Sequence, residues 1–163
     1  MAVANVPGIS TLKMRLGYAV ETIAGTPPTA YTWLQRANSI GSIDLSTETI
    51  DASAIEDEIT RSIAGRQDTG GKWTFSFNLT NETEPVYQKM LDDAAAGLAE
   101  NKRTWFTVWS PYLEKAFFIV AQPGGHIPMS SIDQNALLVV ELSLAIDEYK
   151  GLLTAIKPTT EGE

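Results

Sequence analysis

The sequence predicts a single domain over residues 1–163, built mainly of β-strands with one flanking α-helix. A chain of 163 residues has the length of one domain. Period-two alternation of apolar and polar residues is its commonest pattern, and only residues 84–100 combine apolar residues at helical spacing with a helix start signal. We expect residues 1–11 to form an N-terminal arm and residues 157–163 a flexible C-terminal tail.

The alternating segments predict the strands. In chain order they are residues 12–20, 31–36, 40–50, 72–80, 105–109, 112–121 and 138–146. The clearest is 72–80, in which Trp73, Phe75 and Phe77 share one face and small polar residues share the other. Ser110 and Pro111 predict a hairpin turn between two of the strands.

The helix expected over residues 84–100 should lie on the sheet, because its apolar residues form one stripe. Pro85 suits a first helical turn, with Thr83 or Glu84 as the cap. The stripe consists of Val86, Tyr87, Met90, Leu91, Ala94 and Leu98.

The segment 51–71 shows neither alternation nor a lasting helical stripe, and an irregular connection of this length is unusual in a compact domain. Five carboxylates against two arginines leave residues 51–68 with a net charge of −3. Two interpretations stay open. The segment is either a mobile surface loop or an arm that orders against a neighbouring subunit, with Ile55, Ile59 and Ile63 as anchors at four-residue spacing.

The amino-acid composition restricts the kinds of binding and catalysis that this chain can perform. A net charge of −8 works against a basic face for DNA phosphates, and the absence of cysteine excludes disulfides and thiolate metal sites. His126 is the sole histidine, and no nucleophile-elbow motif accompanies it. The acidic run at 56–58 lacks the spacing of a calcium loop. We therefore expect no catalytic residue, metal or cofactor. A small β-fold enzyme centred on His126 is the competing hypothesis.

No apolar run approaches the length of a membrane-spanning helix, the longest being residues 136–140. We therefore expect no membrane binding by this chain.

The order of motifs over residues 17–80 is distinctive. Gly25-Thr26-Pro27-Pro28 precedes Trp33, the alternating segment 40–50, Asp51-Ala52-Ser53 and the acidic run. Gly65, Asp68 and Gly70 then close the long loop before a strand. In these features the chain resembles the major tail tube proteins of long-tailed (siphovirus) bacteriophages.

This resemblance implies a β-sandwich flanked by one helix, of the type shared by phage tail tubes and the type VI secretion tube. Six subunits would close into a ring with a continuous inner β-barrel, and stacked rings would form a conduit for genome delivery. The implied partners are further copies of the chain, a tape measure protein in the lumen, tail terminator and tail-tip proteins at the two ends, and double-stranded DNA in passage. The implied location is the virion tail, assembled in the host bacterial cytoplasm. A contractile tail or a type VI secretion-like machine is the alternative.

Polar strand faces suggest which residues line such a channel, because a wall without cations does not hold phosphates. The expected lumen-facing residues are Ser42, Asp44, Ser46, Glu48, Thr74, Ser76, Asn78, Thr80, Glu141 and Ser143. The expected inter-subunit loop spans 51–71, with Ile55, Glu56, Asp57, Glu58, Ile59, Arg61, Ile63, Arg66 and Asp68 as its contact residues.

Overall fold

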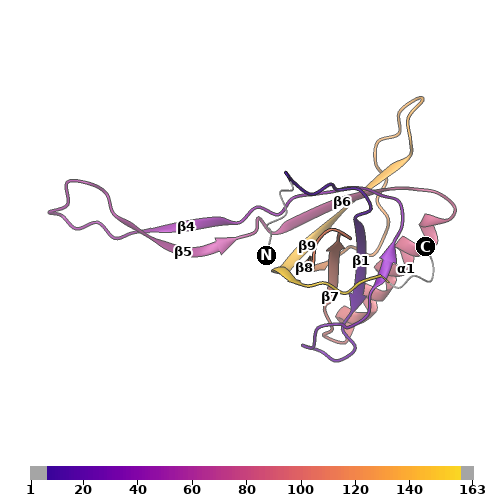
Figure 1. Ribbon diagram of the computed structural model, residues 1–163, viewed down its shortest axis with the longest axis horizontal. Coiled ribbons are helices and arrows are strands. Elements are labelled where there is room, and N and C mark those ends of the chain that lie inside the picture. Colours follow the sequence, from indigo (N-terminus) through magenta and orange to yellow (C-terminus); the bar gives the residue numbers. More distant parts are fainter. Residues whose placement is uncertain (1–6, 159–163) are drawn as a thin grey trace.

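The computed structural model describes residues 7–158 (Figure 1). Most of its secondary structure is formed by segments in which apolar and polar residues alternate. The elements are β1 (Arg15–Val20), β2 (Thr32–Leu34), β3 (Ala37–Ile40), β4 (Ser46–Asp51), β5 (Ser62–Asp68), β6 (Lys72–Asn78), α1 (Thr83–Ala99), β7 (Thr104–Trp109), β8 (Lys115–Gln122) and β9 (Val139–Thr154). The predicted mainly β fold with one helix is confirmed over these residues. The predicted helix differs from α1 by one residue at each end.

Seven strands form one antiparallel sheet in the order β2-β1-β7-β8-β9-β6-β3. The sheet curls over on itself. Trp73 on β6 packs edge-on against Phe106 on β7, with ring centroids 5.5 Å apart, although β8 and β9 lie between these strands in the sheet. Only Gln35 and Arg36 separate the two edge strands, and Arg36 makes this connection with a φ of 59°. The two halves therefore face each other around a common core, as in a sandwich.

Helix α1 closes this core. The ring of Tyr87 stacks on Phe77 of β6 at 3.6 Å, and its hydroxyl donates a hydrogen bond of 2.8 Å to the carbonyl oxygen of Gln35. Gly97 allows the helix to approach β1 closely, because an added Cβ would lie 2.5 Å from a methyl group of Val20. The buried helical residues of the core are Tyr87, Met90 and Leu91.

The two halves of the sheet differ on their outer faces. On β7 and β8 the outer face is covered by a second apolar cluster, formed by Trp105, Ala116, Phe118 and Val120 with Tyr31 and the segment 155–156 packed against it. On β6 and β9 the outward side chains are at least partly exposed, and where the two strands pair they are polar except for Val139 and Ala145. The sheet thus has one polar outer face.

The strand predicted over residues 40–50 is wrong as a single element. The structure has two strands there, β3 and β4, and they belong to different sheets. The chain leaves the sheet at Gly41, whose N–H donates to the carbonyl oxygen of Thr74 at 2.7 Å. Of the apolar residues that alternate along this segment, Leu45 is exposed and Ile43 is half-buried.

The segment 51–71 was expected to lack regular structure, and this is also corrected. It contains β5, which pairs with β4 as a two-stranded antiparallel hairpin. Figure 1 shows this hairpin as a long arm that projects from the body of the protein. We call residues 46–68 the arm.

Three strand boundaries differ from the prediction by three residues or more, among them the start of β8, which lies at Lys115 instead of residue 112. The first strand begins at Arg15 instead of residue 12, after Lys13 takes a φ of 64°. Strand β9 continues to Thr154, eight residues past the predicted end at Ile146, because it pairs with β8 along this extension.

The chain ends are covered only in part. Of the expected N-terminal arm only residues 7–11 are described, and of the expected tail only residues 157–158; both pieces lie outside the strands and the helix. Residues 1–6 and 159–163 lie outside the described part. Across the described residues, no helix has both the length and the apolarity needed to cross a membrane.

Candidate functional site

Five of the expected lumen-facing residues lie together on the polar outer face of β6 and β9. Thr74 is paired with Ser143 and Ser76 with Glu141 across the two strands, so these side chains share one face. Asn78 continues the row, and its Oδ1 accepts a hydrogen bond of 3.0 Å from Nδ2 of Asn38. The register thus gathers small polar groups and one carboxylate on the face opposite the core.

The other five residues of that set lie elsewhere. Ser42 and Asp44 are exposed in the connection between β3 and β4, and Ser46 and Glu48 are exposed on the arm. The hydroxyl of Thr80 accepts hydrogen bonds from the N–H groups of residues 82 and 83, at 3.2 and 3.1 Å. It therefore serves the start of α1, a role that the sequence analysis gave to Thr83 or Glu84. That the polar face lines a channel stays a prediction.

Apart from the hydrogen bond that Asp68 accepts from the N–H of nearby Gly70, the arm has no side-chain hydrogen bond or ion pair to the rest of the described chain. Strands β4 and β5 pair only with each other, and every residue of the arm is exposed except Asp57 and Gly65, which are half-buried. Six carboxylates and two arginines give residues 46–68 a net charge of −4. The arm is an acidic ribbon that no other strand of the described part of the chain pairs with.

Hydrogen bonds within the arm hold its tip in shape. The Asp51 carboxylate accepts a hydrogen bond from the N–H of Ser53, which lowers the pKa of Asp51, and the Asp57 carboxylate accepts one from the N–H of Ala54. The hydroxyl of Ser53 exchanges two further hydrogen bonds with the backbone of Arg61. These bonds are internal to the arm, so they restrict the shape of the tip.

The predicted anchors divide between strand and tip. Ile63 on β5 lies directly opposite Ile50 on β4, so this pair is partly shielded, at 56% and 52% exposure. Ile55 is fully exposed and Ile59 is 80% exposed. The four-residue spacing does not correspond to a helix, because residues 52–61 form the loop of a hairpin.

The remaining predicted contact residues are also on the arm. Glu56 and Glu58 are exposed beside the tip isoleucines, and Asp57 forms an ion pair with Arg61 at 3.6 Å. Arg66 is exposed on β5, and Asp68 accepts a hydrogen bond of 2.9 Å from the N–H of Gly70 as the arm returns to the body. Contact of these residues with another subunit stays a prediction.

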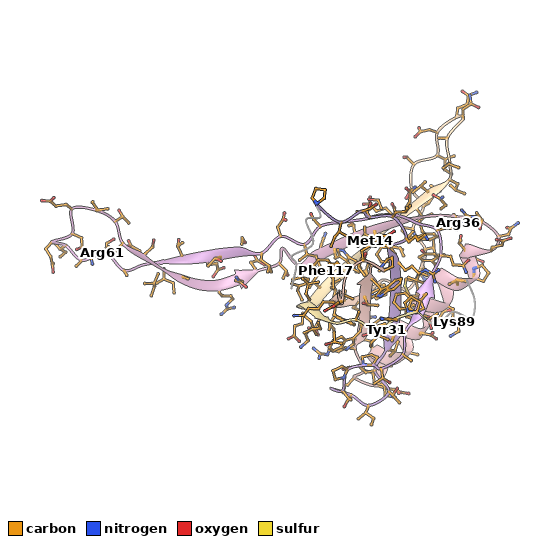
Figure 2. The ribbon with its side chains drawn as sticks, in the orientation of Figure 1. Met14, Tyr31, Arg36, Arg61, Lys89 and Phe117 are labelled. Atoms are coloured by element: carbon orange, nitrogen blue, oxygen red, sulfur yellow. The ribbon has the colours of Figure 1, made fainter. Side chains whose placement is uncertain are left out.

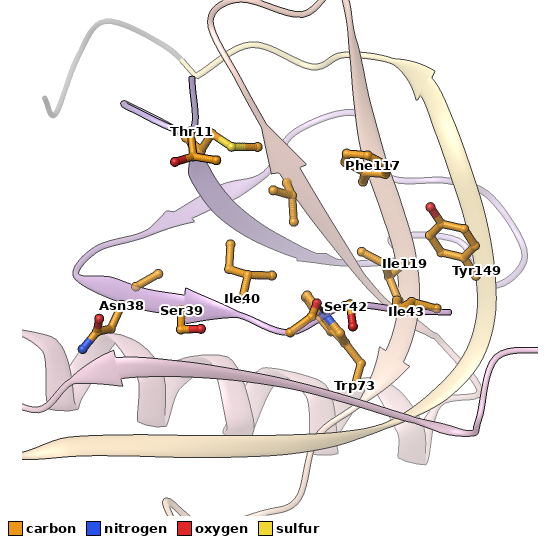
Figure 3. Close-up of a pocket in the computed structure, with 14 residues that line it drawn as sticks. Thr11, Asn38, Ser39, Ile40, Ser42, Ile43, Trp73, Phe117, Ile119 and Tyr149 are labelled. Atoms are coloured by element: carbon orange, nitrogen blue, oxygen red, sulfur yellow. Dashed lines mark hydrogen bonds between the residues drawn. The ribbon is translucent and has the colours of Figure 1, made fainter. Parts of the chain in front are cut away.

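An apolar groove of about 540 Å³ opens at the end of the body where β3 leads into the arm. Figure 3 shows Ile40, Phe117 and Tyr149 around it, and Trp73 beneath. Its lining residues are Thr11, Met14, Ala37, Asn38, Ser39, Ile40, Gly41, Ser42, Ile43, Trp73, Val108, Phe117, Ile119 and Tyr149. Sequence reasoning missed this groove, because its wall comes from five strands and two connections, none of which is unusual alone.

A charge cluster was missed for the same reason. The side chain of Glu21 is fully buried, and its Oε1 accepts a hydrogen bond of 2.7 Å from the N–H of Arg103. The guanidinium of Arg103 lies 3.7 Å from the same oxygen and 3.1 Å from both Asp147 and Glu148. The pKa of Glu148 is lowered, mainly by a hydrogen bond from Lys150 and next by a hydrogen bond from Arg103. This cluster ties the residues at the end of β1 and just before β7 to β9, as a structural network does.

His126 lies exposed in the loop between β8 and β9. Among residues 7–158 it has no hydrogen bond or ion pair, and no group of three metal-ligating side chains occurs in that range. Nothing in this arrangement brings a nucleophile or an acid to the imidazole, and the expectation of a non-enzymatic protein stays a prediction.

Comparison with protein-family models and with curated proteins found no match. Among solved structures, the fold is similar to a chain in the cryo-EM structure of the baseplate of the anti-feeding prophage, 6-fold symmetrised. The TM-score is 0.52 at 15% sequence identity, and the match covers 94% of this chain and 99% of that chain. This likeness shows a shared fold over nearly the whole of both chains.

Proposed function

We propose that this protein is a structural subunit of a phage tail tube, in which six copies close into a ring and stacked rings form a hollow conduit for the genome. The arm is the observation that carries the proposal. An isolated two-stranded ribbon is marginally stable in water, and this one pairs with no other strand among residues 7–158. A neighbouring copy would supply that partner. The fold likeness to a chain of a 6-fold symmetrised particle supports six as the number of copies.

The polar face of β6 and β9 suits the wall of such a conduit. Thr74, Ser76 and Ser143 are small and uncharged, and Glu141 beside them is acidic. Phosphate binding depends on Lys and Arg, and each such contact adds salt-dependent adhesion. The stretch from Thr74 to Asn78 carries no such side chain, and Lys72 at the end of the row is the one cation of β6 on this face. A wall with so few cations would hold DNA weakly, so the duplex would slide past it.

The remaining partners belong to the same proposal. A tape measure protein would occupy the lumen before DNA does, and tail terminator and tail-tip proteins would bind the two ends of the tube. The protein would be assembled in the cytoplasm of the host bacterium and reside in the virion tail. It would have no enzymatic activity, cofactor or membrane contact of its own.

A second candidate is a ring subunit of a contractile tail or of a type VI secretion-like injection machine. The likeness to a chain of the anti-feeding prophage baseplate favours it. The two candidates differ in what surrounds the tube, because only the second expects a sheath. They are separated by negative-stain microscopy of particles that carry the protein, in which a contracted or extended sheath around the tube identifies the second.

The arm gives a direct test of assembly. Thr49 and Ala64 are paired across the hairpin, so replacing residues 50–63 by an Asn-Gly turn removes the outer arm without disturbing the body. The shortened chain should keep its circular dichroism spectrum and melting temperature and remain a monomer at concentrations where the full chain forms hollow rods in the electron microscope. His126→Ala is the matched control and should assemble normally. Normal rods from the shortened chain would contradict the proposed role of the arm, and failure of the full chain to form rods would contradict the proposed function. Loss of assembly in His126→Ala with the fold intact would favour the enzyme hypothesis.

A further inference from the structure

The chain carries two unpartnered apolar features of opposite shape: the projecting tip of the arm and the groove at the end of the body. We infer that the groove of one copy receives Ile55 and Ile59 from the arm tip of another copy. This inference rests on the proposed function, to which it adds the receiving surface.

The tip cannot fill the groove of its own chain. Ile43 lines the groove, and the arm begins only three residues later at Ser46. At about 3.3 Å per residue, an extended strand places Ile55 about 30 Å beyond that root. Figure 2 shows Arg61, close to the tip, far from Met14 and Phe117 of the groove. The partner of the tip is therefore a different copy.

The chemistry of the groove fits aliphatic side chains. Its wall includes Met14, Ile40 and Phe117, and its volume of about 540 Å³ lies in the range of pockets that enclose a small molecule. Ile55 and Ile59 are the most exposed isoleucines of the arm, since Ile50 and Ile63 shield each other. Burial of two isoleucines would remove a large apolar area from water.

Charge favours the same pairing. Glu56 and Glu58 lie between the two tip isoleucines in the sequence and form no ion pair within the described chain. Lys13 lies between the groove residues Thr11 and Met14 in the sequence; it is exposed and likewise unpaired over residues 7–158. An acidic tip that enters an apolar groove with a basic neighbour is oriented by these charges.

The contact joins two different surfaces, so it is heterologous. Contacts of this kind propagate head to tail, and they generate a closed ring or an open stack according to the rotation between copies. The internal hydrogen bonds of the tip reduce the ordering cost of this contact, because they restrict the loop before it binds.

Cysteine cross-linking tests the contact, because the chain has no cysteine of its own. Thr60→Cys marks the tip and leaves both isoleucines in place, and Ser42→Cys marks the groove wall. The two single-cysteine proteins are mixed, assembled and treated with a short bis-maleimide. The expected product is a covalent dimer of one copy of each variant. The matched control pairs Thr60→Cys with Ser143→Cys on the polar face of the sheet, which should yield no dimer.

Each outcome bears on the inference. Rods that form without the Thr60–Ser42 cross-link, or that cross-link Thr60→Cys to Met129→Cys in the exposed loop between β8 and β9, would overturn it and leave the proposed function standing. Failure of the unmodified chain to assemble would overturn both.

A second variant avoids dependence on the cross-linker. The double substitution Ile55→Ser and Ile59→Ser should raise the concentration needed for assembly at least about tenfold. Ile132→Ser, at an exposed isoleucine away from the arm, should leave that concentration unchanged.

Discussion

The indole Nε1 of Trp73 donates a hydrogen bond of 2.9 Å to the carbonyl oxygen of Gly41. Trp73 is buried in the core, and Gly41 is the residue at which the chain leaves the sheet toward the arm. One side chain therefore ties the core, the floor of the groove and the root of the arm together. The direction in which the arm projects is set by this contact and by the backbone bond from Gly41 to Thr74.

Trp73→Phe removes this hydrogen bond while it keeps an aromatic ring in the core. We expect the free energy of unfolding to fall by about 1–3 kcal/mol, because a buried donor is lost and its acceptor is left unpaired. Urea denaturation monitored by circular dichroism measures the loss. Trp109→Phe is the control, since Trp109 is half-buried and contacts Trp33 only edge-on. Equal losses in the two variants would contradict a special role for the Trp73 bond.

Arg103→Ala should destabilise the protein strongly. The substitution leaves the buried carboxylate of Glu21 without its cation, and breaking such a pair costs about 3 kcal/mol. Thermal melts at neutral pH measure the effect. Adding Glu21→Gln to the Arg103→Ala background should restore part of the stability, because the uncompensated buried charge is removed.

The control for Arg103 is Lys89→Ala, which breaks the exposed pair of Lys89 with Asp93 on α1. An exposed pair of this kind is worth about 0.5 kcal/mol or less. A loss in Lys89→Ala as large as that in Arg103→Ala would show that burial of Glu21 is not the cause.

Stability should fall as the pH rises above about 10. Burial is the main cause that raises the pKa of Tyr18, Tyr31 and Tyr87 well above the ordinary value of 10.0, and Asp93 adds to the effect at Tyr18. Above that pH the unfolded chain has lost these phenolic protons while the folded chain retains them. The unfolded state then binds fewer protons, so unfolding becomes more favourable with pH.

Denaturation series from pH 9 to 12 measure this slope, which has an upper limit of about 1.4 kcal/mol per pH unit for each tyrosine. Tyr87→Phe should flatten the slope, whereas Tyr112→Phe, at an exposed position, should leave it unchanged. A slope that does not change in Tyr87→Phe would contradict the prediction.

Amide hydrogen exchange should distinguish the arm from the body. In the monomer, amides of β4 and β5 should exchange far faster than those of β6, because the arm is a lone ribbon with exposed hydrogen bonds. On assembly the amides around Ile55 and Ile59 should become protected. Exchange at the tip that is equally fast in monomers and rods would mean that the tip stays in solvent.

Local pattern predicted those elements whose structure is decided by burial of one face. In β6 the alternation of Trp73, Phe75 and Phe77 required a strand, and the stripe of α1 required a helix. The hairpin of β7 and β8 followed from the same rule. The grouping of Thr74, Ser76 and Ser143 on one face was partly predictable, since period-two alternation assigns the faces but not the neighbouring strand.

The pattern of apolar and polar residues did not predict strand pairing where that pairing is independent of burial. Strand β5 is exposed at nearly every position, so its sequence has no apolar face that could reveal it; the hydrogen bonds to β4 define it. The extension of β9 past Ile146 is likewise decided by its partner β8. The break at Gly41 depends on a contact with Thr74, which is distant in the sequence.

The sequence by itself determined the mainly β class, the single helix, the acidic character of the arm and the polar face, because each depends on the side-chain pattern of a short segment. Only the tertiary structure decided that one sheet curls over on itself, that the acidic segment is a projecting hairpin, and that a groove opens beside its root. These features depend on contacts between residues far apart in the chain, and no local pattern specifies such contacts.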